Sequence, residues 1–149
     1  MFDISVKEDV TLISLHDSPA SIDAIAQVFC QIADAGIDVD MISQTLPNGQ
    51  HSNLSFTVDG EDFGGILRVA ASLRESYPDL KISVSSGNCK ISVRDDAMNG
   101  VPGYAAKVFS AAAGECADIR MVTTSECDIS LLVVKEDLDA TVQAIREKL

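Results

Sequence analysis

The sequence lacks any long apolar segment. No stretch approaches the roughly 18 consecutive apolar residues of a transmembrane helix, and no basic segment leads into an apolar one at the N-terminus. We therefore expect neither a membrane span nor a secretion signal, and a cytoplasmic location. Cysteine is sparse, and no CxxC pair is present. Without an export signal, reduced thiols are expected rather than disulfides or zinc ligands. The four cysteines are Cys30, Cys89, Cys116 and Cys127.

Basic residues are also scarce. The 11 lysines and arginines stand against 23 aspartates and glutamates, which gives a formal net charge of −12. A chain of this charge repels phosphates, so nucleic acids and anionic membranes are excluded as partners. The acidic residues are scattered rather than gathered in a tail, as expected for a solvated surface. Because 46% of the residues are hydrophobic, a folded globular protein is expected.

The motifs of common catalytic and metal sites are absent as well. Only two histidines occur, His16 and His51, and neither lies in an HExxH or similar metal-binding spacing. No GxSxG, P-loop or GxGxxG sequence is found. The acidic pair Asp95-Asp96 flanks a predicted element, where a cap or a solvated end explains it. We therefore expect no catalysis by this chain, and neither a metal nor another cofactor.

Hydrophobic periodicity divides the first part of the chain into six elements, in the order strand, helix, strand, strand, helix, strand. They are residues 10–15, 22–35, 37–45, 53–58, 62–76 and 80–85. Gly36 ends the first helix, and the turn signal Pro47-Asn48-Gly49 separates the second and third strands. This order is the βαββαβ unit of ferredoxin-like folds.

The same order then repeats. The second set of elements is residues 89–94, 104–115, 118–124, 128–134 and 136–148. A shift of 80 residues superposes Val28 on Val108 and Phe29 on Phe109, with further matches around them. An internal duplication of one module explains this agreement better than chance does.

The second set ends on a helix and so lacks its fourth strand. A sheet without that strand would expose an edge and leave the last helix poorly covered. The remaining strand-like segment is residues 2–7, where Phe2, Ile4 and Val6 share a face. We infer that this segment crosses over to complete the second module. The predicted fold is α+β, with two ferredoxin-like βαββαβ modules, antiparallel sheets and helices on one face. The first module is inserted in the second, and the predicted limits are 9–87 for the first and 1–8 plus 88–149 for the second.

Each module has a turn between its first strand and first helix, and a second strand that opens with an aspartate. The N-terminus of a helix offers free N–H groups and a positive dipole end, which suit a carboxylate. Oxygen atoms at the start of the neighbouring strand suit an ammonium group. These features are compatible with a socket for a free amino acid, and also with plain helix-entry turns and caps.

Several segments resemble the regulatory region of aspartokinases. Residues 37–45 read IDVDMISQT, and residues 119–133 read IRMVTTSECDISLLV. They are similar to the family's I-N-I-D-M-I-x-Q strand and its closing I-x-x-I-S-T-S-E-x-x-I-S-V-L hairpin. Met98, Pro102 and Gly103 match the family's G-M-x-x-x-P-G loop at equal length. The resemblance covers nearly the whole chain, and it points to a pair of ACT modules like the small regulatory subunit of some aspartokinases.

What the resemblance implies is an allosteric module without a kinase domain of its own. In the family, two such chains pair through their ACT sheets and hold lysine or threonine at an interface between modules. The bound amino acid adjusts aspartate phosphorylation in lysine, threonine and methionine biosynthesis. The implied partners are therefore a free amino acid effector, a second copy of the chain and a kinase subunit.

The resemblance also implies a set of ligand-binding residues. Asp40 and Gln44 are expected to contact the ligand side chain. Backbone groups of Ile37, Val39 and Ile119 are expected to hold its α-amino and carboxylate groups. The full set is Asp17, Ile37, Asp38, Val39, Asp40 and Gln44 in the first module, and Met98, Pro102, Gly103, Cys116, Asp118 and Ile119 in the second.

The chain also departs from the family pattern. Ala20 follows Pro19 where the family has Pro-Gly, and a glycine there lets a ligand approach the backbone. Asp96 and Ala97 replace glycines that precede the methionine in the family. Two alternatives therefore stay open: a structural dimerisation module that binds no ligand, and a fragment of a full-length aspartate kinase.

Overall fold

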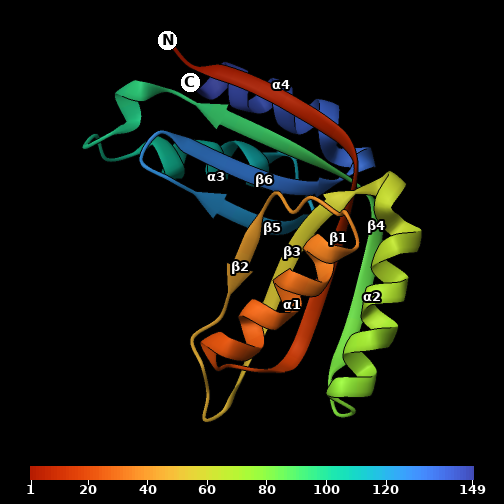
Figure 1. Cartoon of the computed structure of the whole chain (residues 1–149). Coiled ribbons are helices and arrows are strands. Elements are labelled where there is room, and N and C mark those ends of the chain that lie inside the picture. Colours follow the sequence, from red (N-terminus) through yellow and green to blue (C-terminus); the bar gives the residue numbers. More distant parts are fainter. The chain divides into compact units, whose positions relative to one another are not determined.

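The computed structural model describes all 149 residues and contains six strands and four α-helices (Figure 1). The strands are β1 (Asp3–Pro19), β2 (Ile42–Gln44), β3 (His51–Asp59), β4 (Lys81–Arg94), β5 (Ile119–Thr124) and β6 (Asp128–Val134). The helices are α1 (Ile22–Asp34), α2 (Phe63–Ser76), α3 (Tyr104–Gly114) and α4 (Leu138–Lys148). The chain divides into two compact units. We call Val10–Ser86 the first module, and Met1–Asp9 with Gly87–Leu149 the second module.

The two longest strands, β1 and β4, each contribute to both modules. They have 17 and 14 residues. The sequence predicts a pair of separate strands in each stretch, and in this respect the prediction is wrong. No proline lies inside either strand, so no backbone donor is missing from its interior. In each strand, a residue with a left-handed backbone conformation lies where the chain passes from one module to the other. These residues are Asp9 with φ 55° in β1 and Gly87 with φ 73° in β4.

The first module has the strand order β2-β3-β1-β4, which is that of a ferredoxin-like sheet. β1 and β3 pair antiparallel, with Ile13 opposite Phe56 and Leu15 opposite Leu54. These side chains are buried together with the inner residues of α1 and α2. Phe29 of α1 meets Phe56 edge to face, with 5.7 Å between ring centroids. The two helices therefore cover one face of the sheet.

Local capping sets the limits of α1. At its start, Ser21 Oγ accepts a hydrogen bond from the N–H of Ala24 at 3.2 Å. Just beyond its end, Gly36 adopts a left-handed conformation with φ 75°. The helix therefore lies within one residue of the predicted range 22–35.

The strand predicted at 37–45 is much shorter than expected, because only Ile42–Gln44 forms regular β-structure. The N–H of Asp40 donates to Thr57 O, and the N–H of Met41 donates to Thr57 Oγ1, at 3.0 Å each. One residue of β3 thus accepts from two successive donors. A regular ladder cannot form there, and the segment before Ile42 is an irregular connection.

The second module has the strand order β1-β4-β6-β5. β4 and β6 pair antiparallel with Ile91 opposite Leu131, and both side chains are fully buried. Ile4 of β1 belongs to the same core and Phe2 packs against it, whereas Val6 is half-exposed. The leading strand completes the second sheet, so the predicted α+β fold is confirmed: two ferredoxin-like modules, the first inserted in the second.

The contribution of the leading strand to the second core can be measured by truncating one side chain. Ile4 is 9% exposed and Val6 is 44% exposed on the same short stretch. We expect Ile4→Ala to lower the free energy of unfolding by about 2 kcal/mol, because it removes buried apolar atoms. Val6→Ala should cost less than about 0.5 kcal/mol. Urea denaturation measures both, and equal effects would contradict this role of the strand.

Candidate ligand sites

Asp17 and Gln44 lie at the same end of the first module. Asp17 occupies a bulge in β1 with φ 55°, and its N–H donates to Asn53 Oδ1 at 3.2 Å. Its carboxylate lies 3.9 Å from Lys81 Nζ. Gln44 Nε2 donates to Ser52 Oγ on β3 at 3.4 Å. A surface cavity of about 280 Å³ opens there, lined by Asp17, Thr45, Leu46, Asn48, His51, Ser52 and Asn53.

Residues 37–40 lie at the other end of α1. They follow this 13-residue helix, which is about 20 Å long, whereas the first group precedes it. Ile37 is buried in the core and Val39 packs against it, while Asp38 and Asp40 are exposed. The structure therefore brings together only part of the predicted set within one module.

The second module shows the same division. Met98, Pro102 and Gly103 lie together in the loop between β4 and α3, where Met98 is buried and Gly103 has a φ of 107°. A cavity of about 290 Å³ separates this loop from the β5–β6 hairpin. The hairpin residues that line it are Thr124, Ser125, Glu126 and Ile129.

Cys116, Asp118 and Ile119 lie beyond the far end of α3, an 11-residue helix of about 16 Å. Cys116 is exposed with φ 51°, and Ile119 is half-buried. Asp118 already has partners. Its carboxylate accepts from Arg120 Nη2 at 2.9 Å, and its N–H donates to Asp137 Oδ2 at 2.8 Å. These residues do not meet the loop that carries Met98.

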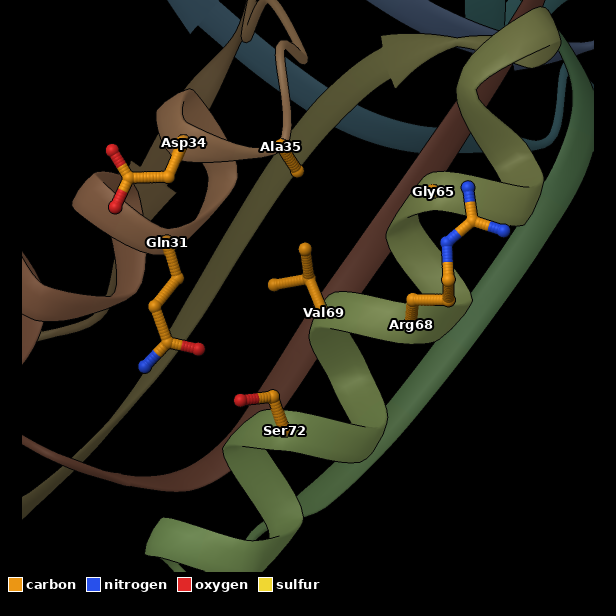
Figure 2. Close-up of a pocket in the computed structure, with 7 residues that line it drawn as sticks. All are labelled: Gln31, Asp34, Ala35, Gly65, Arg68, Val69 and Ser72. Atoms are coloured by element: carbon orange, nitrogen blue, oxygen red, sulfur yellow. The ribbon is translucent and has the colours of Figure 1, made fainter.

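Sequence reasoning missed a third cavity, which lies between α1 and α2 (Figure 2). Its volume is about 400 Å³, and it is lined by Gln31, Asp34, Ala35, Gly65, Arg68, Val69 and Ser72. The only signal in the sequence is that these residues recur at intervals of three or four along each helix. Such spacing is also that of an ordinary solvated helix face, so it does not single out a cavity.

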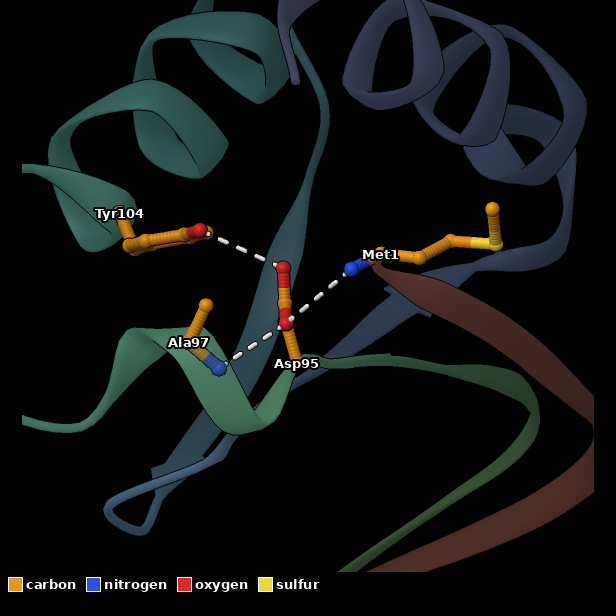
Figure 3. A network of polar contacts seen from close by, with 4 residues as sticks. All are labelled: Met1, Asp95, Ala97 and Tyr104. Carbon is orange, nitrogen blue, oxygen red and sulfur yellow. Dashed lines mark hydrogen bonds and ion pairs between the residues drawn. The ribbon is translucent and has the colours of Figure 1, made fainter.

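The loop between β4 and α3 is held in place by Asp95, whose expected capping role the structure bears out. Asp95 Oδ1 accepts from the N–H of Ala97 at 3.0 Å and lies 3.7 Å from the Met1 ammonium nitrogen (Figure 3). Tyr104 Oη, at the first residue of α3, donates to Asp95 Oδ2 at 3.3 Å. One buried carboxylate thus connects the start of the loop, its end and the amino group of Met1.

These contacts shift the ionisation of the groups involved. The hydrogen bond from the N–H of Ala97 lowers the pKa of Asp95 below its ordinary value of 3.8, although burial opposes this. Burial, and then the negative charge of Asp95, raise the pKa of Tyr104 above 10.0. Burial likewise raises the pKa of Cys89 above 9.0. At neutral pH, Asp95 is therefore a charged acceptor and Tyr104 a neutral donor.

Two broader features of the structure bear on membrane and metal binding. None of its helices combines the length and the apolar character needed to cross a bilayer. No group of three or more histidine, cysteine, aspartate or glutamate side chains is arranged to hold a metal ion. The cysteines are all free, with Cys30 and Cys116 exposed and Cys89 buried.

Known structures similar to this one include regulatory subunits of aspartate kinases and whole aspartate kinases. The ligand-free regulatory subunit from Thermus thermophilus has a TM-score of 0.88 at 26% identity, over 98% of this chain and 96% of that chain. A chain of a structure described as aspartokinase alpha and beta subunits has a TM-score of 0.85 at 29% identity. The match covers 97% of this chain and 95% of that chain. Escherichia coli aspartokinase III in complex with lysine and aspartate has a TM-score of 0.73 at 23% identity. The match covers 98% of this chain and 32% of that chain.

Sequence comparisons point the same way. The family model described as an ACT domain matches residues 82–149. The aspartokinase of Geobacillus stearothermophilus is 28% identical over 144 residues, which are 97% of this chain and 34% of the enzyme. The chain therefore spans about a third of the length of the curated relatives it matches.

The Asp95 contacts predict an acid-dependent stability. Because the pKa of Asp95 is lower in the folded chain than in the unfolded one, its ionised form stabilises the fold above pH 3.8. This contribution is lost as the pH falls below 3.8 through the folded-state pKa. We expect Asp95→Asn to be less stable at neutral pH and to lose less stability in that acidic range than the natural chain does.

Thermal unfolding followed from about pH 7 to about pH 2 measures this difference. Asp96→Asn is the matched control, because the neighbouring Asp96 is exposed. Parallel acid profiles for Asp95→Asn and the natural chain would contradict the role assigned to Asp95.

Proposed function

We propose that this chain, which is similar over nearly its whole length to the ACT-type regulatory part of aspartokinases and has no kinase domain among its 149 residues, senses a free amino acid. The proposed effectors are lysine and threonine, and the proposed effect is control of aspartate phosphorylation in lysine, threonine and methionine biosynthesis. The proposed location is the cytoplasm. The proposed limits of the ACT modules are 9–87 and 1–8 plus 88–149.

The division of the first-module residues between the two ends of α1 carries this proposal. Asp17 and Gln44 lie before and beside the start of the helix, and residues 37–40 lie after its end. A free amino acid cannot contact both groups across a helix of about 20 Å. A site that uses both groups therefore needs a second copy of the module.

The free edge of the first sheet offers the place for that copy. β2 is the terminal strand and pairs only with β3, and its Ile42 is 49% exposed. An uncovered edge strand is a template for pairing with another strand. Antiparallel pairing of β2 with its own copy puts the start of one strand beside the end of the other. Residues 37–40 of one chain would then lie near Gln44 of the other, twice in a symmetric dimer.

The chemistry of the two half-sites suits an amino acid. The exposed carboxylates of Asp17, Asp38 and Asp40 suit an ammonium group, and the net charge of −12 favours a cationic ligand. The start of α1 offers N–H groups for a carboxylate. The lysine complex of the Escherichia coli enzyme gives a precedent in the same fold.

Regulation follows if the effector binds one assembly state more tightly than another. An amino acid held between two copies favours the assembly state in which the site is closed. The size of this shift is set by the difference between its binding free energies for the two assembly states. A kinase subunit in contact with the dimer would respond to that arrangement. The solved assembly of alpha and beta aspartokinase subunits supports such a partner.

A structural role is the second candidate, and one observation favours it for the second module. The Asp118 carboxylate there already accepts from Arg120, and its N–H already donates to Asp137. A ligand would have to displace these contacts. In the first module, the Asp17 carboxylate has a longer contact, 3.9 Å from Lys81 Nζ, so we assign sensing to the first module and support of the assembly to the second.

Thermal unfolding with free amino acids tests this function. An effector at 100 times its dissociation constant should add about 2.7 kcal/mol to the free energy of unfolding. Gln44→Ala should lose most of this gain, because Gln44 is expected to contact the effector. Gln143→Ala is the control, since Gln143 is an exposed glutamine on α4 in the second module.

Sedimentation of the same samples reports the assembly, and we expect the effector to favour a dimer. Stabilisation by none of the twenty amino acids would leave only the structural role. Stabilisation of an unchanged monomer would contradict a site shared between copies.

A further inference from the structure

Thr57 on β3 forms hydrogen bonds with two successive residues of the segment that precedes β2. Its carbonyl oxygen accepts from the N–H of Asp40, and its hydroxyl oxygen accepts from the N–H of Met41, at 3.0 Å each. Its own N–H donates to Met41 O, also at 3.0 Å. In a regular antiparallel pair, the N–H of Met41 would instead donate to the carbonyl oxygen of Thr57. The hydroxyl therefore replaces the carbonyl as the acceptor for Met41, and the carbonyl accepts from Asp40.

Without this replacement, the ladder between β2 and β3 would continue to Val39. β2 pairs antiparallel with β3, and Ile42 lies opposite Phe56. The hydrogen-bonded pairs of an antiparallel ladder recur at every second residue, so the next pair after Met41 would be Val39 with Asp59. Both the N–H and the C=O of Val39 would then be bonded to Asp59. In the structure, however, these groups of Val39 have no hydrogen-bond partner in the chain.

The second module shows the same stretch of the repeat without the hydroxyl. Met121 is the counterpart of Met41 in the repeated sequence, and it lies opposite Leu132, whose side chain has no acceptor. There β5 begins at Ile119, two residues before Met121, and Ile119 is already paired with Val133. In the first module, β2 begins only after Met41. The ladder thus extends further in the module that lacks the hydroxyl, as expected if the hydroxyl interrupts it.

The segment between α1 and β2 is held at both ends. Thr57 is fully buried and Met41 is 3% exposed, so the hydrogen bond between them is shielded from water. At the other end, Ile37 is buried in the core, and a Cβ atom added at Gly65 of α2 would lie 3.1 Å from Ile37 Cδ1. Glycine at this position therefore lets α2 lie close to Ile37. The unpaired backbone groups of Val39 lie between these two fixed points.

From these contacts, we propose that Thr57 is a positioning residue of the effector site. Its hydroxyl keeps the backbone N–H and C=O of Val39 out of the ladder, so that they are available to the carboxylate and α-amino groups of the amino acid. This inference rests on the proposed function, in which Ile37, Val39 and Asp40 contact the effector. Thr57 is fully buried, so it does not contact the effector itself and acts only through this segment.

The structural part of this inference is tested without an effector, by NMR spectroscopy of Thr57→Val and Thr57→Ser. Valine has the shape of threonine but no acceptor, whereas serine keeps the hydroxyl. In Thr57→Val, a regular ladder should bring the Hα atoms of Asp40 and Val58 together, and a nuclear Overhauser effect between them should appear. Amide exchange should become about tenfold slower at Val39, which gains a hydrogen bond, and faster at Asp40, which loses one. Thr57→Ser should show none of these changes.

The functional part is tested by calorimetric titration with lysine and with threonine. Thr57→Val should weaken the binding of whichever amino acid the natural chain binds about tenfold, because Val39 no longer offers free backbone groups. Thr57→Ser should change this affinity by less than about twofold. Thr57→Ala removes the same hydroxyl without the bulk of valine, and it should also weaken binding. The matched control is Thr11→Val, which should leave the affinity unchanged, because Thr11 on β1 is equally buried and its hydroxyl has no partner.

Three results would overturn the inference. One is an unchanged ladder in Thr57→Val, with no new contact between Asp40 and Val58, which would show that the hydroxyl does not interrupt the pairing. Another is an altered ladder with unchanged affinity, which would show that the backbone of Val39 does not serve the effector and would leave the proposed function standing. The third is a natural chain that binds neither lysine nor threonine, which would overturn the proposed function as well.

Discussion

The fold depends on two strands that each serve two sheets. β1 and β4 cross from one module to the other at Asp9 and Gly87, so the second module is made of two separate stretches of sequence and the first module lies between them. Backbone N–H and C=O groups at a sheet edge need partners or water. The leading residues provide those partners in the second sheet, and Ile4 provides apolar surface in its core. Separating the modules would therefore break both backbone pairing and side-chain packing.

This shared framework also determines where ligand-binding groups can lie. In a βαββαβ module, the first helix begins at one end of the sheet and ends at the other, so residues before and after it are separated by its full length. Asp17 and Asp38 illustrate the result in the first module. No change of side chains can bring them together within one copy. A binding site that uses both has to be made by assembly, and ligand binding and assembly are then coupled.

Much of this could be read from the sequence, because strands and helices leave a periodic pattern. The duplication and the missing strand indicated the insertion of one module in the other. The strand at 37–45 could not be predicted to its true length, since the hydrogen bonds to Thr57 depend on a side chain from another strand. Likewise, local pattern identified Asp95 as a cap, but not its contacts with Tyr104 and Met1, because these depend on tertiary folding. The cavity between α1 and α2 depends on how far two helices stand apart, which no single-residue pattern encodes.

The Asp95 contacts also explain why the second module is better suited to supporting the assembly than to sensing an effector. Glycines before the methionine would let a ligand approach the backbone, but they would leave the loop conformationally free. Asp96 and Ala97 replace them here, and the preceding carboxylate fixes the loop through the N–H of Ala97 and the hydroxyl of Tyr104. The loop is therefore held by contacts that exist without a ligand. Ligand binding would then restrict the conformational freedom of the loop only slightly further. An effector that acts by ordering its site would therefore gain less from binding at this loop.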